Sequence, residues 1–300
     1  MALFHGLSAF PITPTDAHGV VDTGAVERLT SRLVTAGVDS IGLLGSTGGY
    51  AYLSRTERQR AIQAAVATAA GKVPLMVGVG ALRTDDAQQL ARDAAEAGAD
   101  ALLLAPMSYT PLTQDEVFQH YVAVTGVTDL PLCVYNNPGT THFTFTRELL
   151  ARLASVPNVA AIKMPLPGAM TIKVELDQLR GGPMERLAIG YSGDWGAAEA
   201  FLSGADAFYS VVGGLLPDIA MAMRRAAASG DRREVERIDT TLQPMWALFR
   251  EFGSIRVMYA AATELQLSDA APPRPILPLS RDEQRRVAIV VRGCIDAAGT

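Results

Sequence analysis

One lysine lies where the chain could carry out covalent chemistry on a ketone. Lys163 follows Val159-Ala160-Ala161-Ile162, an apolar run that is typical of a buried strand. Only three of the 26 basic residues are lysines, at positions 72, 163 and 173, and the others are arginines. An arginine stays protonated, whereas a buried lysine can lose its proton and attack a carbonyl carbon to form a Schiff base. The alternative is a lysine that lies along apolar surface with its ammonium in water.

Two other segments offer hydroxyl groups for the same chemistry. Tyr135 ends the apolar run that precedes the one with Lys163, and a phenol within hydrogen-bond reach can move a proton. Ser46 and Thr47 lie in the glycine-rich run Gly45–Gly49, and such a turn can direct hydroxyls and backbone N–H groups at a carboxylate. Each also has an ordinary interpretation. Tyr135 could be a core tyrosine whose hydroxyl binds a backbone group, and Ser46 and Thr47 could belong to a simple tight turn.

A repeated unit would position these residues. Gly37, Gly98 and Gly204 each follow an alanine-rich stretch with helical spacing and precede an apolar run. Glycine adopts the left-handed conformation at low cost, so each is predicted to end a helix, and the run after it is predicted to be a strand. The eight predicted strands are Leu7–Ile12, Ser40–Gly45, Pro74–Gly80, Ala101–Pro106, Pro131–Asn136, Val159–Met164, Arg186–Ser192 and Ala207–Val212.

Strands that alternate with helices imply a parallel α/β sheet. Eight such units favour a closed (β/α)₈ TIM barrel over the alternative, an open doubly wound sheet. The expected domains are a catalytic barrel over residues 1–230 and a small C-terminal helical appendage over residues 231–300. Because the active site of such a barrel lies at the C-terminal ends of its strands, Lys163, Tyr135 and the Ser46-Thr47 turn are expected to meet at one mouth.

Composition narrows the class of protein. The 300 residues are 49% hydrophobic and 19% charged, which is typical of a packed globular chain. A formal net charge of -5 argues against a nucleic-acid-binding surface. The sequence shows neither a membrane span nor a signal peptide, so we expect a cytoplasmic protein. The two cysteines and four dispersed histidines have no metal-ligand spacing, and we expect no metal site.

The ordered combination of motifs resembles a known family. Gly45-Ser46-Thr47-Gly48, Tyr135-Asn136-Asn137-Pro138, Lys163 and Ser192-Gly193-Asp194 resemble the dihydrodipicolinate synthase / N-acetylneuraminate lyase family of class I, pyruvate-dependent aldolases. The resemblance covers essentially the whole chain. It implies a Schiff-base-forming lyase that acts on pyruvate or another 2-oxo acid and needs no cofactor. It also implies a homo-oligomer, either a dimer or a tetramer.

The resemblance implies a role for each matching residue. Lys163 would attack C2 of the 2-oxo acid, and Tyr135 would relay protons together with Ser46. Thr47 and nearby backbone N–H groups would hold the substrate carboxylate. The residues expected to meet the rest of the substrate are Asn137, Thr140, Gly193, Asp194 and Tyr209.

The chain also departs from the family pattern. Thr140 stands where synthase members carry an arginine for the carboxylate of the second substrate, and threonine cannot form that bidentate pair. Gly49 replaces a glutamate, with Tyr50 next to it to fill the vacated space. Ser108 replaces a tyrosine that a neighbouring subunit lends, unless Tyr109 substitutes after a shift of one residue.

These departures favour a catabolic aldolase or dehydratase that acts on a 2-oxo-3-deoxy acid with a neutral tail. One alternative is 4-hydroxy-tetrahydrodipicolinate synthase of lysine biosynthesis, which Thr140 disfavours. Another is a non-catalytic member that binds an oxo acid. A sugar-phosphate barrel with a phosphate site at Gly213-Gly214 would leave the buried lysine unexplained.

Overall fold

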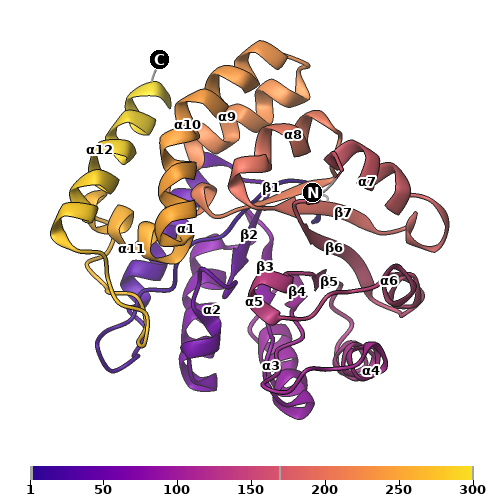
Figure 1. Ribbon diagram of the computed structural model, residues 1–300. Helices are drawn as coiled ribbons and strands as arrows, with labels where there is room; N and C mark the ends of the chain where they lie inside the picture. The colour runs from indigo at the N-terminus through magenta and orange to yellow at the C-terminus, as the bar shows by residue number, and fades with distance from the viewer. Residues whose placement is uncertain (1–2, 169, 299–300) are drawn as a thin grey trace.

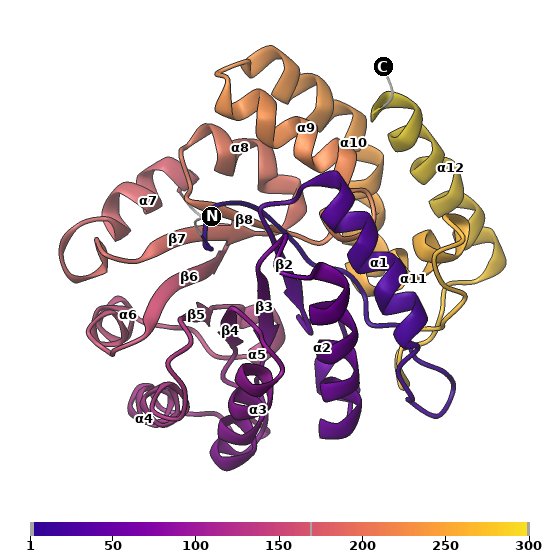
Figure 2. The ribbon, with the colours of Figure 1, turned by 180° about the vertical axis from the view of Figure 1, so that it is seen from behind.

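The computed structural model describes residues 3–168 and 170–298, which form a closed barrel of parallel strands in the order β1 to β8 (Figures 1 and 2). Strand β8 pairs with β1 and closes the sheet. The predicted TIM barrel is therefore confirmed. The strands are β1 Gly6–Ala9, β2 Ser40–Leu43, β3 Leu75–Gly78, β4 Ala101–Leu104, β5 Leu132–Tyr135, β6 Val159–Pro165, β7 Ala188–Ser192 and β8 Ala207–Ser210.

Helices separate the strands and cover the outside of the barrel (Figures 1 and 2). The α-helices are α1 Thr23–Ala36, α2 Arg55–Ala69, α3 Thr84–Glu96, α4 Gln114–Thr125, α5 Pro138–Thr141, α6 Arg147–Ala154, α7 Ile172–Leu179, α8 Ala197–Leu202, α9 Pro217–Ala228, α10 Arg232–Phe252, α11 Ser254–Glu264 and α12 Arg281–Ala298. Short 3₁₀ helices are η1 Tyr50–Tyr52, η2 Gly182–Met184, η3 Asp194–Gly196 and η4 Val212–Gly214.

Most observed strands are shorter than the predicted ones, especially at their C-terminal ends. Strand β1 ends at Ala9 rather than Ile12, and β8 ends at Ser210 rather than Val212. Barrel strands are tilted and staggered, so their last residues leave the ladder and build the mouth. Gly37, Gly98 and Gly204 all have positive φ, as expected at helix ends.

The barrel interior holds its own cluster of side chains, separate from the larger core between strands and helices. Tyr135 and Tyr209 belong to the inner cluster with Phe10 and Ala161. Side chains alternate along a strand, so Lys163, two residues after Ala161 on β6, points to the same inner side. The amine does not face the helices.

Gly42 on β2 leaves room for the Phe10 ring inside the barrel. A Cβ at this position would overlap the ring. Gly42→Ala is therefore expected to lower the free energy of unfolding by about 1–3 kcal/mol, because overpacking forces side chains off their preferred rotamers. Urea denaturation would measure the change. Gly293→Ala is the matched control: a Cβ at this exposed position in α12 meets no atom within 4 Å, so stability should not fall.

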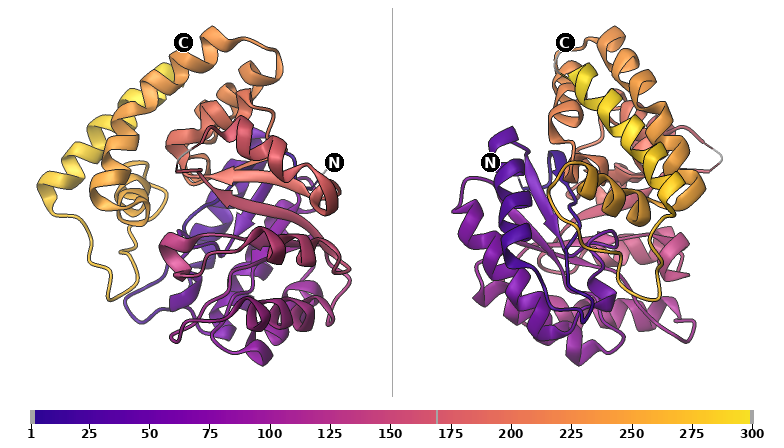
Figure 3. Two further views of the ribbon diagram at one scale, coloured as in Figure 1. Left: turned by 45° about the vertical axis from the view of Figure 1, so that its right-hand side comes forward. Right: turned by 90° about the vertical axis from the view of Figure 1, so that its left-hand side faces the viewer.

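The C-terminal helices stand together on one side of the barrel (Figure 3). Helix α10 packs against α8, α9 and η3, and α12 packs against α9, α10 and α11. Buried side chains of this region, such as Trp246 and Val287, belong to the same core cluster as those of the barrel helices. The division at residue 230 stays a prediction. None of the helices within residues 3–168 and 170–298 has the length and hydrophobicity to cross a bilayer.

Candidate active site

Lys163 lies in the barrel wall between β5 and β7. It is in register with Tyr135 on β5 and with Gly190 on β7. The residue is only 3% exposed. Its Nζ lies 3.9 Å from the centre of the Phe10 ring, 4.3 Å from that of Tyr135 and 5.4 Å from that of Tyr209. No side chain in the described part of the chain forms a hydrogen bond or an ion pair with this nitrogen, and three aromatic rings have their centres 5.4 Å or less from it.

A cavity of about 530 Å³ opens above Lys163. Strand ends and the loops after them form most of its wall, and α10 and α11 supply Phe249 and Ser254. The predicted site residues Ser46, Thr47, Tyr135, Asn137, Thr140, Lys163, Gly193, Asp194 and Tyr209 all line it. The structure thus brings the whole predicted set to one cavity.

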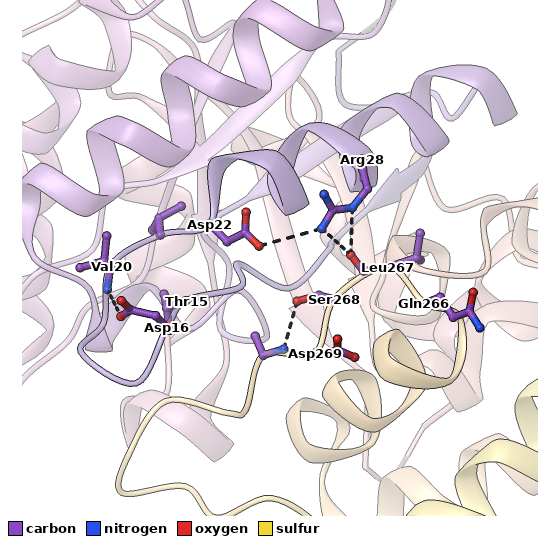
Figure 4. A pocket seen from close by; sticks show the side chains of 11 residues that line it. Thr15, Asp16, Val20, Asp22, Arg28, Gln266, Leu267, Ser268 and Asp269 are labelled. Atoms are coloured by element: carbon purple, nitrogen blue, oxygen red, sulfur yellow. Dashed lines mark hydrogen bonds and ion pairs between the residues drawn. The ribbon is translucent and has the colours of Figure 1, made fainter.

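A larger hollow of about 790 Å³ lies elsewhere, between the segment before α1 and the turn after α11 (Figure 4). Its polar groups largely bind one another. Arg28 donates to the carbonyl of Leu267 through both Nε and Nη2, and it lies 3.9 Å from Asp22. None of the predicted site residues lines this hollow.

A chain of hydrogen bonds converges on the Tyr135 hydroxyl. Asn137 Nδ2 donates to the Tyr135 oxygen at 2.8 Å and to Thr140 Oγ1 at 2.8 Å. Ser46 Oγ lies 3.1 Å from the same phenol oxygen. Because Asn137 occupies one acceptor position of the phenol, the phenol proton is free to point to Ser46 or into the cavity. This arrangement suits a group that must gain and lose a proton.

The turn that carries Ser46 and Thr47 begins with a strained residue. Leu44 has φ of 56°, in the left-handed region that branched and bulky residues rarely adopt. Such a conformation costs about 1–3 kcal/mol and persists where the surroundings impose it. The carbonyl of Leu44 lies against Gly78, where a Cβ would overlap it. The sequence gives no signal for this strain, because leucine is not a residue that marks a left-handed turn.

Tyr209 and Cys133 form a buried layer beneath the amine. The Tyr209 hydroxyl lies 3.5 Å from Cys133 Sγ, and its ring packs edge-on against Phe10 at 6.0 Å between centres. Burial raises the pKa of the Cys133 thiol to about 12 and raises that of the Tyr209 phenol well above its ordinary value. Both groups therefore stay protonated near neutral pH, and Tyr209 contributes ring surface to the cavity.

Asp194 lies in the cavity wall, but its carboxylate oxygens bind the chain itself. Ser210 Oγ donates to Oδ1 at 2.6 Å, and the N–H groups of Val212 and Val211 donate to Oδ1 and Oδ2 at 3.0 and 3.1 Å. Burial raises the pKa of Asp194, while these hydrogen bonds oppose the increase. The carboxylate thus holds the turn after β8. It does not cap the helices that follow it, because neither η3 nor α8 has a side-chain cap.

Two of the departures from the family pattern, at Gly49 and Ser108, have distinct structural settings. Gly49 has φ of 65°, which glycine adopts without strain. Tyr50 is buried against Gly80 and Arg58 rather than lining the cavity, so the expectation that it fills vacated space in the pocket was wrong. Ser108 donates to the carbonyl of Thr110, and Tyr109 is 97% exposed in the single chain.

Sequence reasoning missed several residues of the cavity wall. They include Phe10, Trp195 and Phe249. Trp195 follows the end of β7 and could have been found by extending the same rule three residues further. Phe249 lies in α10, more than 80 residues after Lys163, and no local pattern indicates that its helix reaches the mouth.

Comparison with known proteins agrees with this geometry. The sequence profile described as the dihydrodipicolinate synthetase family matches residues 3–293. The chain belongs to this family. It is a lyase of the class I aldolase type, and the family resemblance predicted from its motifs is confirmed. Within the described residues, no group of three or more His, Cys, Asp or Glu side chains could hold a metal ion.

Individual members of the family cover nearly the whole chain. A 4-hydroxy-tetrahydrodipicolinate synthase of Alcanivorax borkumensis is 33% identical over 94% of this chain and 95% of its own length. One from Methylococcus capsulatus is 36% identical over 83% and 84%. The crystal structure of a dihydrodipicolinate synthase from Agrobacterium tumefaciens is 57% identical, covers 97% of this chain and 98% of its own, and has a TM-score of 0.94.

Proposed function

We propose that Lys163 forms a Schiff base with C2 of pyruvate or a related 2-oxo acid. The observation that carries the proposal is the unpaired Nζ at the base of the cavity, beside the hydrogen-bonded hydroxyl of Tyr135. The amine attacks the ketone carbon, and water leaves as the imine forms. The protonated imine withdraws electrons from C3, so a bond at C3 or C4 can form or break without a metal.

Tyr135 moves the protons of this reaction. Its hydroxyl accepts from Asn137 and lies beside Ser46, which gives the proton a route between the cavity and the Ser46-Thr47 turn. Thr47 is nearly buried and lines the cavity, and with the N–H groups of its turn it holds the substrate carboxylate. Asn137, Thr140, Gly193, Asp194 and Tyr209 shape the space around the rest of the substrate.

A second candidate concerns the direction of the reaction. The names of the curated relatives favour 4-hydroxy-tetrahydrodipicolinate synthase over the cleavage or dehydration that the sequence favoured. Thr140 argues against the synthase, because a threonine stands where the synthases carry an arginine. Its hydroxyl accepts a hydrogen bond from Asn137. Two assays separate them: condensation of pyruvate with aspartate semialdehyde, and pyruvate release from 2-oxo-3-deoxy acids. A non-catalytic member would bind oxo acids and turn over neither.

Borohydride reduction in the presence of pyruvate tests the covalent step. We expect the reductant to fix one pyruvate on the peptide with Lys163, measured by peptide mass mapping. Lys173 is the internal control, because it is exposed and paired with Asp177, and its peptide should stay unmodified. An adduct on Lys173 alone, or no pyruvate-dependent adduct, would contradict the proposal.

The assembly and location of the enzyme follow the family resemblance. We propose a cytoplasmic homo-oligomer, a dimer or tetramer, in which the exposed Tyr109 contacts a neighbouring subunit. A monomeric dihydrodipicolinate synthase variant is 25% identical to this chain. Sedimentation of the purified protein would therefore decide between a monomer and an oligomer.

A further inference from the structure

One side of the cavity is apolar. Pro165, Leu166 and Pro167 follow Lys163 at the end of β6, and Trp195 follows β7. Phe249 of α10 completes the set. These five side chains offer a single polar atom, the indole nitrogen of Trp195, to a bound molecule. The hydroxyl-bearing residues Ser46, Thr47, Tyr135 and Thr140 come from the turns after β2 and β5 instead.

The apolar wall is built to a fixed shape. Leu166 packs where a side chain at Gly193 or Gly196 would otherwise lie: a Cβ at Gly193 would be 3.1 Å from Leu166 Cδ1, and one at Gly196 would overlap its side chain. Trp195 is 44% exposed, and the guanidinium of Arg250 lies 5.5 Å from its ring centre on the helix side. Preorganised apolar surface of this kind binds an apolar group at little conformational cost.

The cavity has almost no charge to offer a second anionic group. Among the described residues that line it, only Lys163 and Asp194 are ionisable with acidic or basic side chains. The Lys163 nitrogen is consumed by the imine, and both Asp194 oxygens already accept hydrogen bonds from the turn after β8, so neither group offers an anion a partner. Arg250 is exposed and does not line the cavity. A carboxylate or phosphate on the far end of the substrate would therefore lose water without gaining a partner.

We propose, building on the Schiff-base function, that the far end of the substrate is an apolar group that packs on Leu166, Trp195 and Phe249. The substrate class is a 4-hydroxy-2-oxo acid with an aromatic or branched alkyl group on C4, or the corresponding apolar aldehyde together with pyruvate. A polyhydroxylated or carboxylated tail does not match this wall.

The proposed cleavage balances without an oxidant or reductant. In the Lys163 imine the C3–C4 bond breaks, and its electron pair moves through C3 to the imine nitrogen to give an enamine. The C4 hydroxyl gives its proton to the Tyr135 relay and becomes the aldehyde oxygen. The enamine then takes a proton at C3, and water releases pyruvate and frees the amine. Condensation is the reverse sequence.

Three substrates of different tail chemistry test the proposal: 4-hydroxy-2-oxo-4-phenylbutanoate and a 2-oxo-3-deoxy sugar acid in cleavage, and aspartate semialdehyde with pyruvate in condensation. We expect kcat/KM for the phenyl compound to exceed that for the sugar acid by about 10-fold or more, the scale on which an apolar pocket discriminates. Condensation should likewise be faster with benzaldehyde than with aspartate semialdehyde. Higher kcat/KM for either polar partner would overturn the proposal.

Variants of the wall provide a second readout. Trp195→Ala and Leu166→Ala should each lower kcat/KM for the phenyl compound by about 10-fold or more, mainly through KM, whereas Trp195→Phe keeps a ring and should retain most of it. Leu277→Ala is the control, because Leu277 is 69% exposed and lies outside the cavity. Equal losses for phenyl and sugar-acid substrates would overturn the proposal.

Borohydride fixation of pyruvate tests the Schiff-base function separately from the apolar subsite. A Lys163 adduct together with a preference for polar tails would overturn only the apolar subsite. No adduct on Lys163 would overturn the Schiff-base function and the subsite with it.

Discussion

Lys163→Arg is expected to abolish turnover and the pyruvate adduct together. Arginine has much of the length of the lysine side chain, but its guanidinium stays protonated and cannot attack a ketone. Removal of a catalytic nucleophile typically costs about 10³-fold or more in kcat. Steady-state pyruvate release, or its condensation, measured with and without borohydride would check both effects on one preparation.

Two comparisons make this result specific. Lys173→Arg changes an exposed lysine by the same chemistry and should leave activity and the adduct unchanged. Circular dichroism of the Lys163 variant would show whether the barrel is intact. A folded Lys163→Arg enzyme that keeps more than about one tenth of the wild-type kcat is incompatible with covalent catalysis by this residue.

Tyr135→Phe should be the second most damaging substitution. The change removes only the hydroxyl on which Asn137 and Ser46 converge, and it keeps the ring that lies 4.3 Å from the Lys163 amine. Loss of a positioned proton donor and acceptor typically costs about 10²–10⁴-fold, so we expect kcat to fall by that factor. Stopped-flow or steady-state assays would measure kcat separately from KM.

Ser46→Ala removes the hydroxyl next to the Tyr135 phenol but leaves the phenol and the hydrogen bond that it accepts from Asn137. The fall in kcat should therefore be smaller than for Tyr135→Phe. Borohydride should still fix pyruvate on Lys163 in Tyr135→Phe when incubation is long, because the nucleophile remains. A Tyr135→Phe enzyme with unchanged kcat would remove the tyrosine from the proton relay.

The parts of the site that lie on strands were predictable from sequence. A continuous apolar run fixes which residues are strand, and the barrel places all C-terminal strand ends on one face. The order of the strands and their buried character therefore suffice to bring Lys163, Tyr135 and the Ser46-Thr47 turn to one mouth. Alternation along β6 also puts Lys163 on the same side as Ala161, inside the barrel.

Other parts of the site depend on contacts between distant segments. The bonds that occupy Asp194 come from residues 16 to 18 positions later, and the carbonyl of Leu44 lies against Gly78 on the next strand. Such packing leaves no local pattern in sequence. The same reason explains why Phe249 was missed, since its approach to the mouth depends on how α10 packs against α8, α9 and η3.

The origin of Phe249 has a consequence for how enzymes of this architecture diversify. Lys163, the proposed nucleophile, and Tyr135 lie on strands whose spacing the sheet dictates, whereas Phe249 lies on a helix that follows the eighth repeat. Under the proposed function, substitutions along that helix should change which substrates are accepted and leave the reacting groups undisturbed. If the last 70 or so residues of this chain are replaced by those of a relative, the chimera should acquire part of the relative's substrate selectivity. It should still form the Schiff base on Lys163.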